Sequence, residues 1–380
     1  MKLPGSGKIC KRSSMVKKNQ CGNTFSKKKT TIYEIAEQAG VSITTVSRVL
    51  NNSPLVSENT RKLVQAVIEN NHFSPNALAQ GLSNNESRSI GVVLPDITNP
   101  YFSSLFLEIE RYSLEQNYSV VLFNTLYGSF SQSFQKTIGE STYFKMIVDK
   151  RLDGVIITGG QLDKDVISPE YLAALNELQQ QLPVVIIGQR FPGANCVFVQ
   201  RSLASGVLAV IRHLYALGHK RIGFLGGEPG VRITTDRFHA YKQTLETMNL
   251  PYNPKYVHFS DYYIPDGYAA MQAQLRSERP TAFIAINDMV ALGAIRAITD
   301  AGLRVPEDIA IVSCDSFYFG EYSVPRLTSL DQQNDYLGRL AIISLINLMK
   351  GLNEDVPISH NPRLVVRESC GAQLGIRHLE

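Results

Sequence analysis

The sequence predicts a small all-α head followed by a larger α/β body. Residues 30–72 contain three short apolar patterns at helical spacing, whereas residues 90–371 alternate strand-like apolar runs with helix-like stretches. Between them, the segment 83–89 is polar and holds no residue that would form a core. A chain of 380 residues with 44% hydrophobic content is long enough for more than one globular domain. We therefore expect separate folding units on either side of this link.

In the head, the first two helical patterns are joined by a tight segment, AGVS. Thr31 stands three residues before Glu34, a spacing typical of a capping box at a helix start. Gly40 ends this helix and Ser42 caps the next one. A third helix begins at Ser57. The apolar positions of these helices are Ile32, Ile35, Ala36, Ala39, Val46, Val49, Leu50, Leu63, Val64, Val67 and Ile68.

Two short helices joined in this way form a helix-turn-helix, whose second helix lies in the major groove of DNA. The exposed side of that helix carries small polar groups and Arg48. An ordinary small helical bundle would give the same spacing, so the pattern alone leaves both interpretations open.

The body predicts parallel sheets, because its strand-like runs are apolar throughout and would be buried on both faces. These runs are IGVVLP, YSVVLFN, GVIITG, PVVIIG, RIGFLGG, AFIAI and IAIVSCD. A span of this length favours two lobes, and ligands of such sheets bind at the carboxyl ends of the strands. The polar residues that follow the strands are Asp96, Asn99, Asn124, Gln189, Arg190, Asn287, Asp288 and Asp315.

Charge is distributed unevenly along the chain. Residues 1–29 hold nine Lys or Arg and no acidic residue, although the whole chain has 38 basic and 34 acidic side chains. Such a basic extension indicates a polyanionic partner. The alternatives are a disordered leader without a specific role, or a true start downstream, at Met15. The basic N-terminus lacks the apolar segment expected of a signal peptide, and no apolar run approaches the roughly 20 residues of a membrane span. Its five cysteines form no C-x-x-C pair, which favours free thiols in a reducing cytoplasm.

Two competing classes of protein are disfavoured by the sequence. An enzyme would be expected to carry a motif such as G-x-G-x-x-G, G-x-S-x-G or a P-loop, and these are absent. The histidines His213, His219 and His239 lack partners at metal-ligand spacing, so we expect no catalytic residues, metal or cofactor. A sugar-binding protein of a transporter would need export, whereas this chain has a DNA-type head.

In order along the chain, several motifs together resemble the LacI/GalR family of bacterial transcription regulators, from Thr31 to about Gly371. They are TIYEIAEQAGVSITTVSRVLNNSPLVSENTRKLV, FSPNALAQGL, GVVLPDITNPYFSSL, RLDGVII, LGHKRIGFLGG, FIAINDMVALGAIRAITDAGLRVPEDIAIVSCD and VPRLTSL. The segment QRFPGANC leans toward the galactose-repressor branch. The resemblance implies a helix-turn-helix head and a two-lobe effector domain like a periplasmic binding protein.

The resemblance also implies a division of the chain. The expected parts are a basic N-terminal extension at 1–29, a DNA-binding domain at 30–73, a hinge helix and linker at 74–89, an effector and dimerisation domain at 90–371 and a tail at 372–380. The first lobe would take about 90–189 and 328–355, and the second about 192–317 and 362–371. Crossings between the lobes would then lie near 188–192, 317–327 and 355–362.

Contacts to DNA carry over from the family position by position. Ile43 and Thr44 would read base edges, and Arg48 would bind guanine or a phosphate. Leu82 would open a central base step from the minor groove, with Ala79 facing the groove floor, although Gly81 weakens this hinge helix. The expected phosphate contacts are Thr31, Tyr33, Ser42, Thr45, Ser47, Asn51, Ser57 and Asn76; Thr31 and Ser57 would also cap helices.

Effector contacts carry over in the same way. Phe102 would form a stacking wall for a sugar or base ring, while Tyr101 packs or lines the rim. The expected polar contacts are Arg190, Arg237, Asn287, Asp315 and Gln332. Asp288 is expected to cap a helix. Such a combination of aromatic and polar groups suits a polyhydroxylated ligand.

Together these features predict a cytoplasmic, nucleoid-associated repressor of carbohydrate-metabolism genes. It would bind a palindromic operator as a homodimer and be released by a sugar-type inducer. The alternative is an activator or co-repressor-dependent regulator that responds to a nucleobase or a phosphorylated metabolite. The tail is too short for a heptad helix, so a dimer is preferred to a tetramer.

Overall fold

A computed structural model of the chain describes residues 30–50, 52–71, 73, 86–126, 139–352 and 359–372. It divides the chain into two compact units, Met1–Ser83 and Asn84–Glu380, which we call the head and the body. Among these described residues, no helix combines the length and apolar character needed to cross a membrane.

In the described part of the head the chain forms the helices α1 (Ile32–Gln38), α2 (Ile43–Leu50) and α3 (Glu58–Asn70). Gly40 in the turn between α1 and α2 has a φ of +61°, a conformation that costs glycine little. The core of the head consists of Ile35, Ala36, Ala39, Val46, Val49 and Val64, as expected. Leu63, also on α3, lies outside this core, since its side chain is 52% exposed.

The first lobe of the body is a six-stranded sheet with helices on both faces. Its elements are β1 (Ser89–Leu94), α5 (Pro100–Glu115), β2 (Ser119–Asn124), α6 (Glu140–Asp149), β3 (Gly154–Thr158), the 3-10 turn η1 (Gly160–Asp163), α7 (Pro169–Gln181), β4 (Val184–Ile187), β5 (Val197–Arg201), α12 (Asn334–Met349) and β11 (Ser359–His360). The strand order is β11-β5-β4-β3-β1-β2, and every neighbouring pair is parallel.

The second lobe repeats this plan. Its elements are α8 (Leu203–Ala216), β6 (Ile222–Leu225), α9 (Arg232–Thr247), η2 (Pro254–Tyr256), β7 (Val257–His258), α10 (Ile264–Gln274), β8 (Ala282–Ala285), α11 (Asp288–Asp300), β9 (Ala310–Ser313), η3 (Tyr318–Glu321), β10 (Thr328–Asp331) and β12 (Arg363–Val365). The strand order is β12-β10-β9-β8-β6-β7, with β12 antiparallel to β10. The predicted parallel α/β architecture is therefore confirmed.

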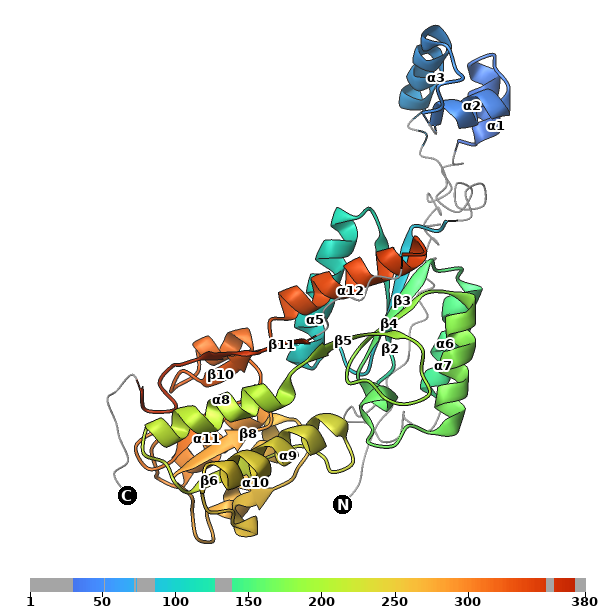
Figure 1. Cartoon of the computed structure of the whole chain (residues 1–380). Coiled ribbons are helices and arrows are strands. Elements are labelled where there is room, and N and C mark those ends of the chain that lie inside the picture. The colour runs from blue at the N-terminus through green and yellow to red at the C-terminus, as the bar shows by residue number, and fades with distance from the viewer. Residues whose placement is uncertain are drawn as a thin grey trace, which may run out of the picture. The chain divides into compact units, whose positions relative to one another are not determined.

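Each sheet is buried because helices cover both of its faces. In the first lobe, α5 and α12 lie on one side of the sheet and α6 and α7 on the other (Figure 1). In the second lobe, α8 packs with α9, and α10 packs with α11. The central strands β3, β4, β6, β8 and β9 are completely buried, which explains why their sequences are apolar without alternation.

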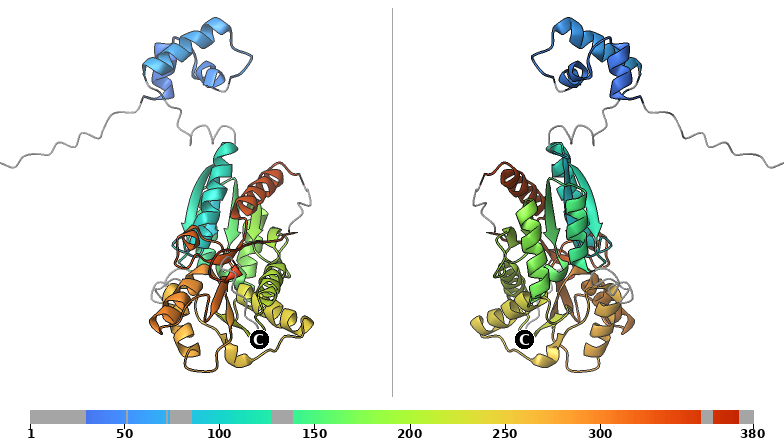
Figure 2. Two further views of the ribbon diagram at one scale, coloured as in Figure 1. Left: turned by 90° about the vertical axis from the view of Figure 1, so that its left-hand side faces the viewer. Right: turned by 90° about the vertical axis from the view of Figure 1, so that its right-hand side faces the viewer.

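The chain passes between the lobes three times. The first crossing follows β5 at Arg201–Leu203, the second joins β10 to α12 at Gln332–Gln333, and the third joins β11 to β12. Figure 2 shows the red helix α12 beside the teal helix α5 of the first lobe. The strand before α12, β10, belongs to the second lobe, and so does the last strand, β12.

The sequence placed two of these crossings too early. We expected them at 188–192 and 317–327, because β5 and β10 were not recognised as strands. β5 is short and ends in the polar pair Gln200 and Arg201, and β10 contains Thr328, Ser329 and Asp331. Both strands nevertheless continue the sheet of the lobe that precedes them. The third crossing lies within the expected range 355–362.

Candidate DNA-binding surface and effector pocket

The outer face of α2 presents the side chains expected to read DNA. Ile43 is 40% exposed, and Thr44 and Arg48 are exposed as well, whereas Val46 and Val49 turn into the core. The helix contains no acidic residue, and Arg48 in its last turn is its charged group. This surface can therefore approach a polyanion without like-charge repulsion and offers both apolar and hydrogen-bonding groups to base edges.

Hydroxyl groups stabilise the starts of α1, α2 and α3. Thr31 forms the predicted capping box with Glu34, whose Oε2 accepts from the Thr31 backbone N–H at 2.8 Å. Ser42 Oγ accepts from the Thr45 N–H at 3.2 Å, and Ser57 Oγ caps α3. Thr31, Ser42 and Ser57 are exposed, so they remain accessible to phosphates, and Thr45 and Ser47 are half-buried. Tyr33 is 69% exposed beside them.

Arg61 on α3 holds the segment that follows α2. Its Nη2 donates to the carbonyl of Ser53 at 2.7 Å, and its Nη1 donates to Asn52 Oδ1 at 3.3 Å. Asn52 itself adopts a left-handed conformation with a φ of 51°. These bonds fix where the chain goes after α2 and so help to orient the helix. The expected contacts Asn51, Asn76, Ala79 and Leu82 lie outside the described residues.

A pocket of about 880 Å³ of empty space, including its open mouth, lies between the two lobes of the body. We call it the main pocket. The first lobe contributes residues that follow β1 and β3 and the last residue of β5, and the second lobe contributes residues that follow β6, β7, β8 and β9. The carboxyl ends of both parallel sheets therefore meet at this pocket, as the general rule for such sheets requires.

Arg237 and Asp315 form the second-lobe floor of the main pocket. Their Nη2 and Oδ1 atoms lie 2.9 Å apart, and both side chains are buried. Arg237 also donates to the backbone carbonyls of Ile286 and Cys314, at the ends of two neighbouring strands. Burial disfavours the charged form of Arg237, but the neighbouring Asp315 carboxylate offsets this effect. The pKa of Arg237 is therefore raised. The guanidinium is thus a fixed cation in the floor.

Asn287 and Asp288 are neighbours at the start of α11 but have different roles. Asn287 lines the main pocket, but it also caps α11, because its Oδ1 accepts from the Val290 N–H at 2.9 Å. Asp288 is fully buried behind it and accepts hydrogen bonds from Ser313 Oγ and from the Phe317 N–H. Burial raises the pKa of Asp288 to about 8. The helix cap predicted for Asp288 is therefore supplied by its neighbour.

The first-lobe wall of the main pocket contains Phe102 and Asp163. Gly159, between β3 and η1, has a φ of +70°, and a Cβ there would lie 2.6 Å from Phe102 Cζ. Glycine at this position therefore lets the turn that carries Asp163 pass close to the Phe102 ring. Burial raises the pKa of the Asp163 carboxyl to about 6, although Arg201 and Arg232 oppose that rise.

Contacts between the lobes close one side of the main pocket. Tyr263 donates from its hydroxyl to Asp96 Oδ2 at 2.7 Å, and Thr235 donates to Asp165 Oδ2 at the same distance. Arg232 donates to the backbone carbonyl of Asp165 at 3.2 Å. These bonds join residues of opposite lobes, so the structure describes the lobes in a closed arrangement.

Two expected effector contacts lie away from the main pocket. Arg190 is exposed on the loop between β4 and β5, with its guanidinium carbon 5.4 Å from the ring centre of Phe198. Gln332, at the second crossing, donates to the carbonyl of Cys314. Neither residue lines the main pocket, whereas Phe102, Arg237, Asn287 and Asp315 all do.

Arg201 and Asp163 line the main pocket but were not predicted from the sequence. Arg201 is the last residue of β5, and its guanidinium carbon lies 4.4 Å from the ring centre of Tyr101 in the main pocket. Asp163 follows β3, the strand whose trailing polar residues were not considered. The rule that ligands bind at the carboxyl ends of strands would have found Asp163 if it had been applied to β3, and Arg201 once β5 was recognised.

Comparison with known proteins agrees with this geometry. Residues 31–76 match the model of bacterial regulatory proteins of the lacI family, and residues 211–370 match a periplasmic binding protein-like domain. The HTH-type transcriptional repressor PurR of Haemophilus influenzae strain PittEE is 33% identical over 345 residues, which cover 89% of this chain and 98% of the repressor. The chain belongs to the LacI family.

Solved structures of the Lac repressor and of another transcription regulator confirm the fold. The Lac repressor dimer bound to operator and the anti-inducer ONPF has a TM-score of 0.79 and 28% identity, covering 90% of this chain and 99% of that chain. The complex of the transcriptional regulator CelR with cellobiose has a TM-score of 0.64 and 26% identity, covering 90% and 100%. The protein is thus a DNA-binding transcriptional repressor of the LacI family. The PurR relative gives no support to the galactose-repressor branch suggested by residues 189–196.

Proposed function

We propose that the protein represses transcription as a homodimer on a palindromic operator and is released by a neutral, polyhydroxylated inducer of the sugar type. The observation that carries this proposal is the composition of the main pocket. It combines aromatic and aliphatic walls with carboxylates and amides drawn from both lobes, a mixture suited to the polar edges and apolar faces of a sugar ring.

Charge balance favours a neutral ligand over a phosphorylated one. Five carboxylates and three cations line the main pocket. Two of the cations already have partners, since Arg237 pairs with Asp315 and Lys164 lies 3.8 Å from Glu228. A phosphate group would add negative charge to a site with a surplus of it, which is unfavourable. Carboxylates, by contrast, accept hydrogen bonds from sugar hydroxyls.

We assign the effector contacts to Phe102, Asp163, Arg201, Arg237, Asn287 and Asp315. The cellobiose bound by the similar CelR regulator supports a sugar ligand. A nucleobase is the second candidate, because Phe102 from the first lobe and Tyr262 from the second both line the main pocket and offer aromatic faces to a flat ring. The DNA-binding experiment described below would show whether a nucleobase acts as a co-repressor or as an inducer.

The dimer is supported by exposed apolar side chains on each lobe. Leu107 and Leu114 on α5 are 61% and 63% exposed, and Ile343 on the adjacent helix α12 is 39% exposed. On the second lobe, Tyr322 and Val324 are 80% and 90% exposed. A second copy would bury these groups, and the similar Lac repressor was solved as a dimer on its operator.

We further propose that the exposed groups of α2 make the sequence-specific contacts, with Ile43 and Thr44 at base edges and Arg48 at guanine or phosphate. The capping hydroxyls of Thr31, Ser42 and Ser57 would add phosphate contacts. A regulator of chromosomal genes acts at the nucleoid, so we place the protein in the cytoplasm. The regulated genes would then be those that metabolise the inducing carbohydrate.

The test begins with operator selection from a random DNA pool by the full-length protein. Fluorescence anisotropy on the selected duplex would then be measured with added sugars and, separately, with added nucleobases. We expect a palindromic consensus and loss of binding with a sugar. Gain of binding with a nucleobase would replace the inducer by a co-repressor. Equal affinity for selected and scrambled duplexes at moderate salt would refute sequence-specific recognition altogether.

A further inference from the structure

A buried carboxyl group holds the turn that carries Asp163 from behind. Glu140 is the first residue of α6, is only 5% exposed and does not line the main pocket. Its Oε2 accepts from the Gln161 N–H of η1 at 2.9 Å, and its Oε1 accepts from the Tyr171 hydroxyl at 3.0 Å. Tyr171 lies on α7 and is itself buried. Glu140 therefore ties η1 to two helices of the first lobe.

The backbone of η1 packs closely against two side chains. Gly160 has a φ of +68°, and a Cβ there would lie 2.7 Å from Glu140 Oε2. The preceding Gly159 is equally close to Phe102, since a Cβ there would lie 2.6 Å from Cζ of that ring. Both glycines adopt a conformation that other residues rarely adopt. The turn therefore has little freedom to shift while the carboxyl group and the ring are in place.

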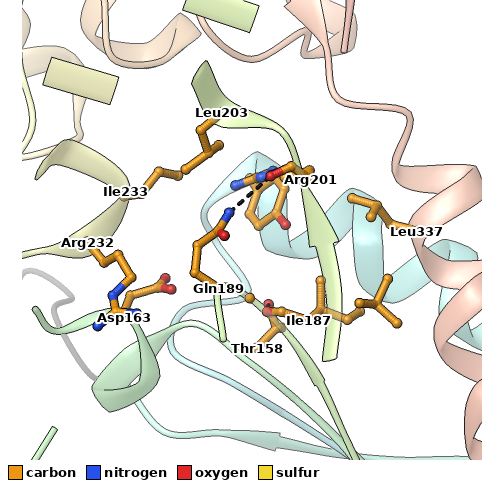
Figure 3. Close-up of a pocket in the computed structure, with 12 residues that line it drawn as sticks. Thr158, Asp163, Ile187, Gln189, Arg201, Leu203, Arg232, Ile233 and Leu337 are labelled. Carbon is orange, nitrogen blue, oxygen red and sulfur yellow. Dashed lines mark hydrogen bonds between the residues drawn. The ribbon is translucent and has the colours of Figure 1, made fainter. Parts of the chain in front are cut away.

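The same turn supplies groups to the proposed effector site and to the contact between the lobes. Gly160 and Asp163 line the main pocket. Figure 3 shows the Asp163 side chain beside Arg232 of the second lobe, in a small hollow that adjoins the main pocket. Shortly after η1, the N–H of Asp165 donates to the carbonyl of Gly230 in the second lobe at 3.0 Å. A shift of η1 would therefore displace both the Asp163 carboxyl and a contact between the lobes.

Burial of a carboxyl group at this position is unfavourable in itself. Desolvation raises the pKa of Glu140 to about 7, although the hydrogen bonds from Gln161 and Tyr171 oppose the rise. An apolar side chain would fill the same space without this penalty, but it could not accept from the Gln161 N–H. The bond to η1 therefore accounts for a carboxyl group here.

We propose that Glu140 is a positioning residue of the effector site, which holds η1 so that Asp163 meets the bound effector. Glu140 itself does not touch the effector. This inference rests on the proposed assignment of Asp163 as an effector contact. A binding group must be held to within about 0.5 Å of its productive position, so a looser turn would weaken the contact that Asp163 makes.

Hydrogen exchange of the full-length protein tests the position of η1 without any ligand. Glu140→Leu removes both acceptors but keeps an apolar side chain of similar size. We expect amide exchange in peptides that span η1 to rise about tenfold, because the Gln161 N–H loses its partner, whereas β4 of the same sheet should stay protected. Glu140→Gln should restore slow exchange, since its amide can accept from Gln161 and donate to Tyr171. Unchanged exchange of η1 in a folded Glu140→Leu protein would refute the proposal.

Tyr171→Phe is the matched control, because it removes the other hydrogen bond of Glu140 and leaves the bond to Gln161 intact. We expect this variant to lower the free energy of unfolding but to keep η1 protected. Equal exchange of η1 in Tyr171→Phe and Glu140→Leu would show that the carboxyl group has only a structural role. If Glu140→Leu failed to fold, Glu140→Asp would replace it, since its shorter side chain withdraws the carboxylate from Gln161.

Isothermal titration then tests the link from η1 to the effector. The probes are D-glucose, D-galactose, D-ribose and cellobiose. For a probe that binds, Glu140→Leu should weaken affinity about tenfold, Glu140→Gln by less than about threefold and Tyr171→Phe by less than about twofold.

A double-mutant cycle with Asp163→Asn separates positioning from general destabilisation. Once Asp163 is replaced, Glu140→Leu should weaken sugar binding by less than about threefold, because the group that Glu140 positions is already altered. Equal losses with and without the Asp163 carboxyl would overturn the positioning role while leaving the sugar-type effector in place. If none of the four sugars bound, the proposed sugar effector would fail, and the exchange of η1 would decide the role of Glu140 on its own.

Discussion

Arg237 and Asp315 form a buried ion pair, with 2.9 Å between guanidinium nitrogen and carboxylate oxygen, at the point where strands β8 and β9 end. The pair joins the helix α9 to two neighbouring strands of the second lobe and also lines the main pocket. It therefore links the stability of that lobe to the chemistry of the proposed effector site.

Replacing Asp315 by Ala should destabilise the protein strongly. Removal of the carboxylate leaves the Arg237 charge buried without its partner, a change that costs about 3–5 kcal/mol in comparable pairs. Urea denaturation would measure the loss in free energy of unfolding. Asp308→Ala is the control, since its partner Arg304 is 68% exposed and the loss should stay below about 1 kcal/mol. Equal losses in the two variants would contradict a structural role for the buried pair.

Replacing Arg48 by Ala should weaken operator binding without affecting the fold. Arg48 is exposed on α2, so its removal leaves the head core intact. If it binds guanine, we expect a loss of about 1–3 kcal/mol and relaxed preference at one base pair; if it binds phosphate, scrambled DNA should lose affinity equally. Arg276→Ala removes the same charge from an exposed position of the body and should have little effect. Unchanged operator affinity for Arg48→Ala would remove Arg48 from the interface.

Replacing Tyr263 by Phe should weaken effector binding by loosening the closed lobes. The variant loses the 2.7 Å bond from Tyr263 to Asp96, which joins the two lobes across the main pocket. One hydrogen bond of this kind corresponds to a factor of about three to ten in affinity. Titration calorimetry would measure it, and small-angle scattering would detect more open lobes. Tyr268→Phe, which breaks a bond to Asp300 within the second lobe, should leave both measurements unchanged.

The buried carboxyl of Asp288 should make stability depend on pH. Its pKa rises from an ordinary value near 4 to about 8 because the site is desolvated. The folded state therefore keeps a proton that the unfolded chain releases above about pH 4. Stability from this group is present at lower pH and is lost as the pH rises through about 8.

In Asp288→Asn, the side-chain amide can still form hydrogen bonds with the Phe317 N–H and with Ser313 Oγ, but it cannot ionise. Denaturation curves between about pH 5 and pH 9 should show a smaller decline of stability for this variant than for the unmodified protein. Asp300→Asn is a useful comparison, because Arg296 lowers the pKa of that exposed carboxyl and its effect lies below this range. Identical pH profiles for Asp288→Asn and the unmodified protein would show that Asp288 does not titrate there.

Periodicity and strand-end reasoning predicted much of the fold and part of the site. The capping box at Thr31 and the apolar strands were readable because each depends on neighbours in sequence. β5 and β10 could not be recognised from the sequence, because polar residues interrupt them. They are stabilised by pairing with β4 and β9, which are separate runs in the sequence. The position of Arg201 depends on β5, so the same error placed Arg190 in the pocket instead. Gln332 lies beside a strand end but uses its amide to hold Cys314.

Because the chain passes between the two sheets three times, the lobes are difficult to produce as separate fragments. Neither lobe corresponds to a continuous stretch of sequence, so no pair of stop and start codons yields either one intact. A fragment that ended after β10 would keep most of the second sheet but strip α12 and β11 from the first, exposing the apolar surface of Val185, Ile187 and Val199. Truncation at that point should therefore produce aggregation rather than a half-sized binding module.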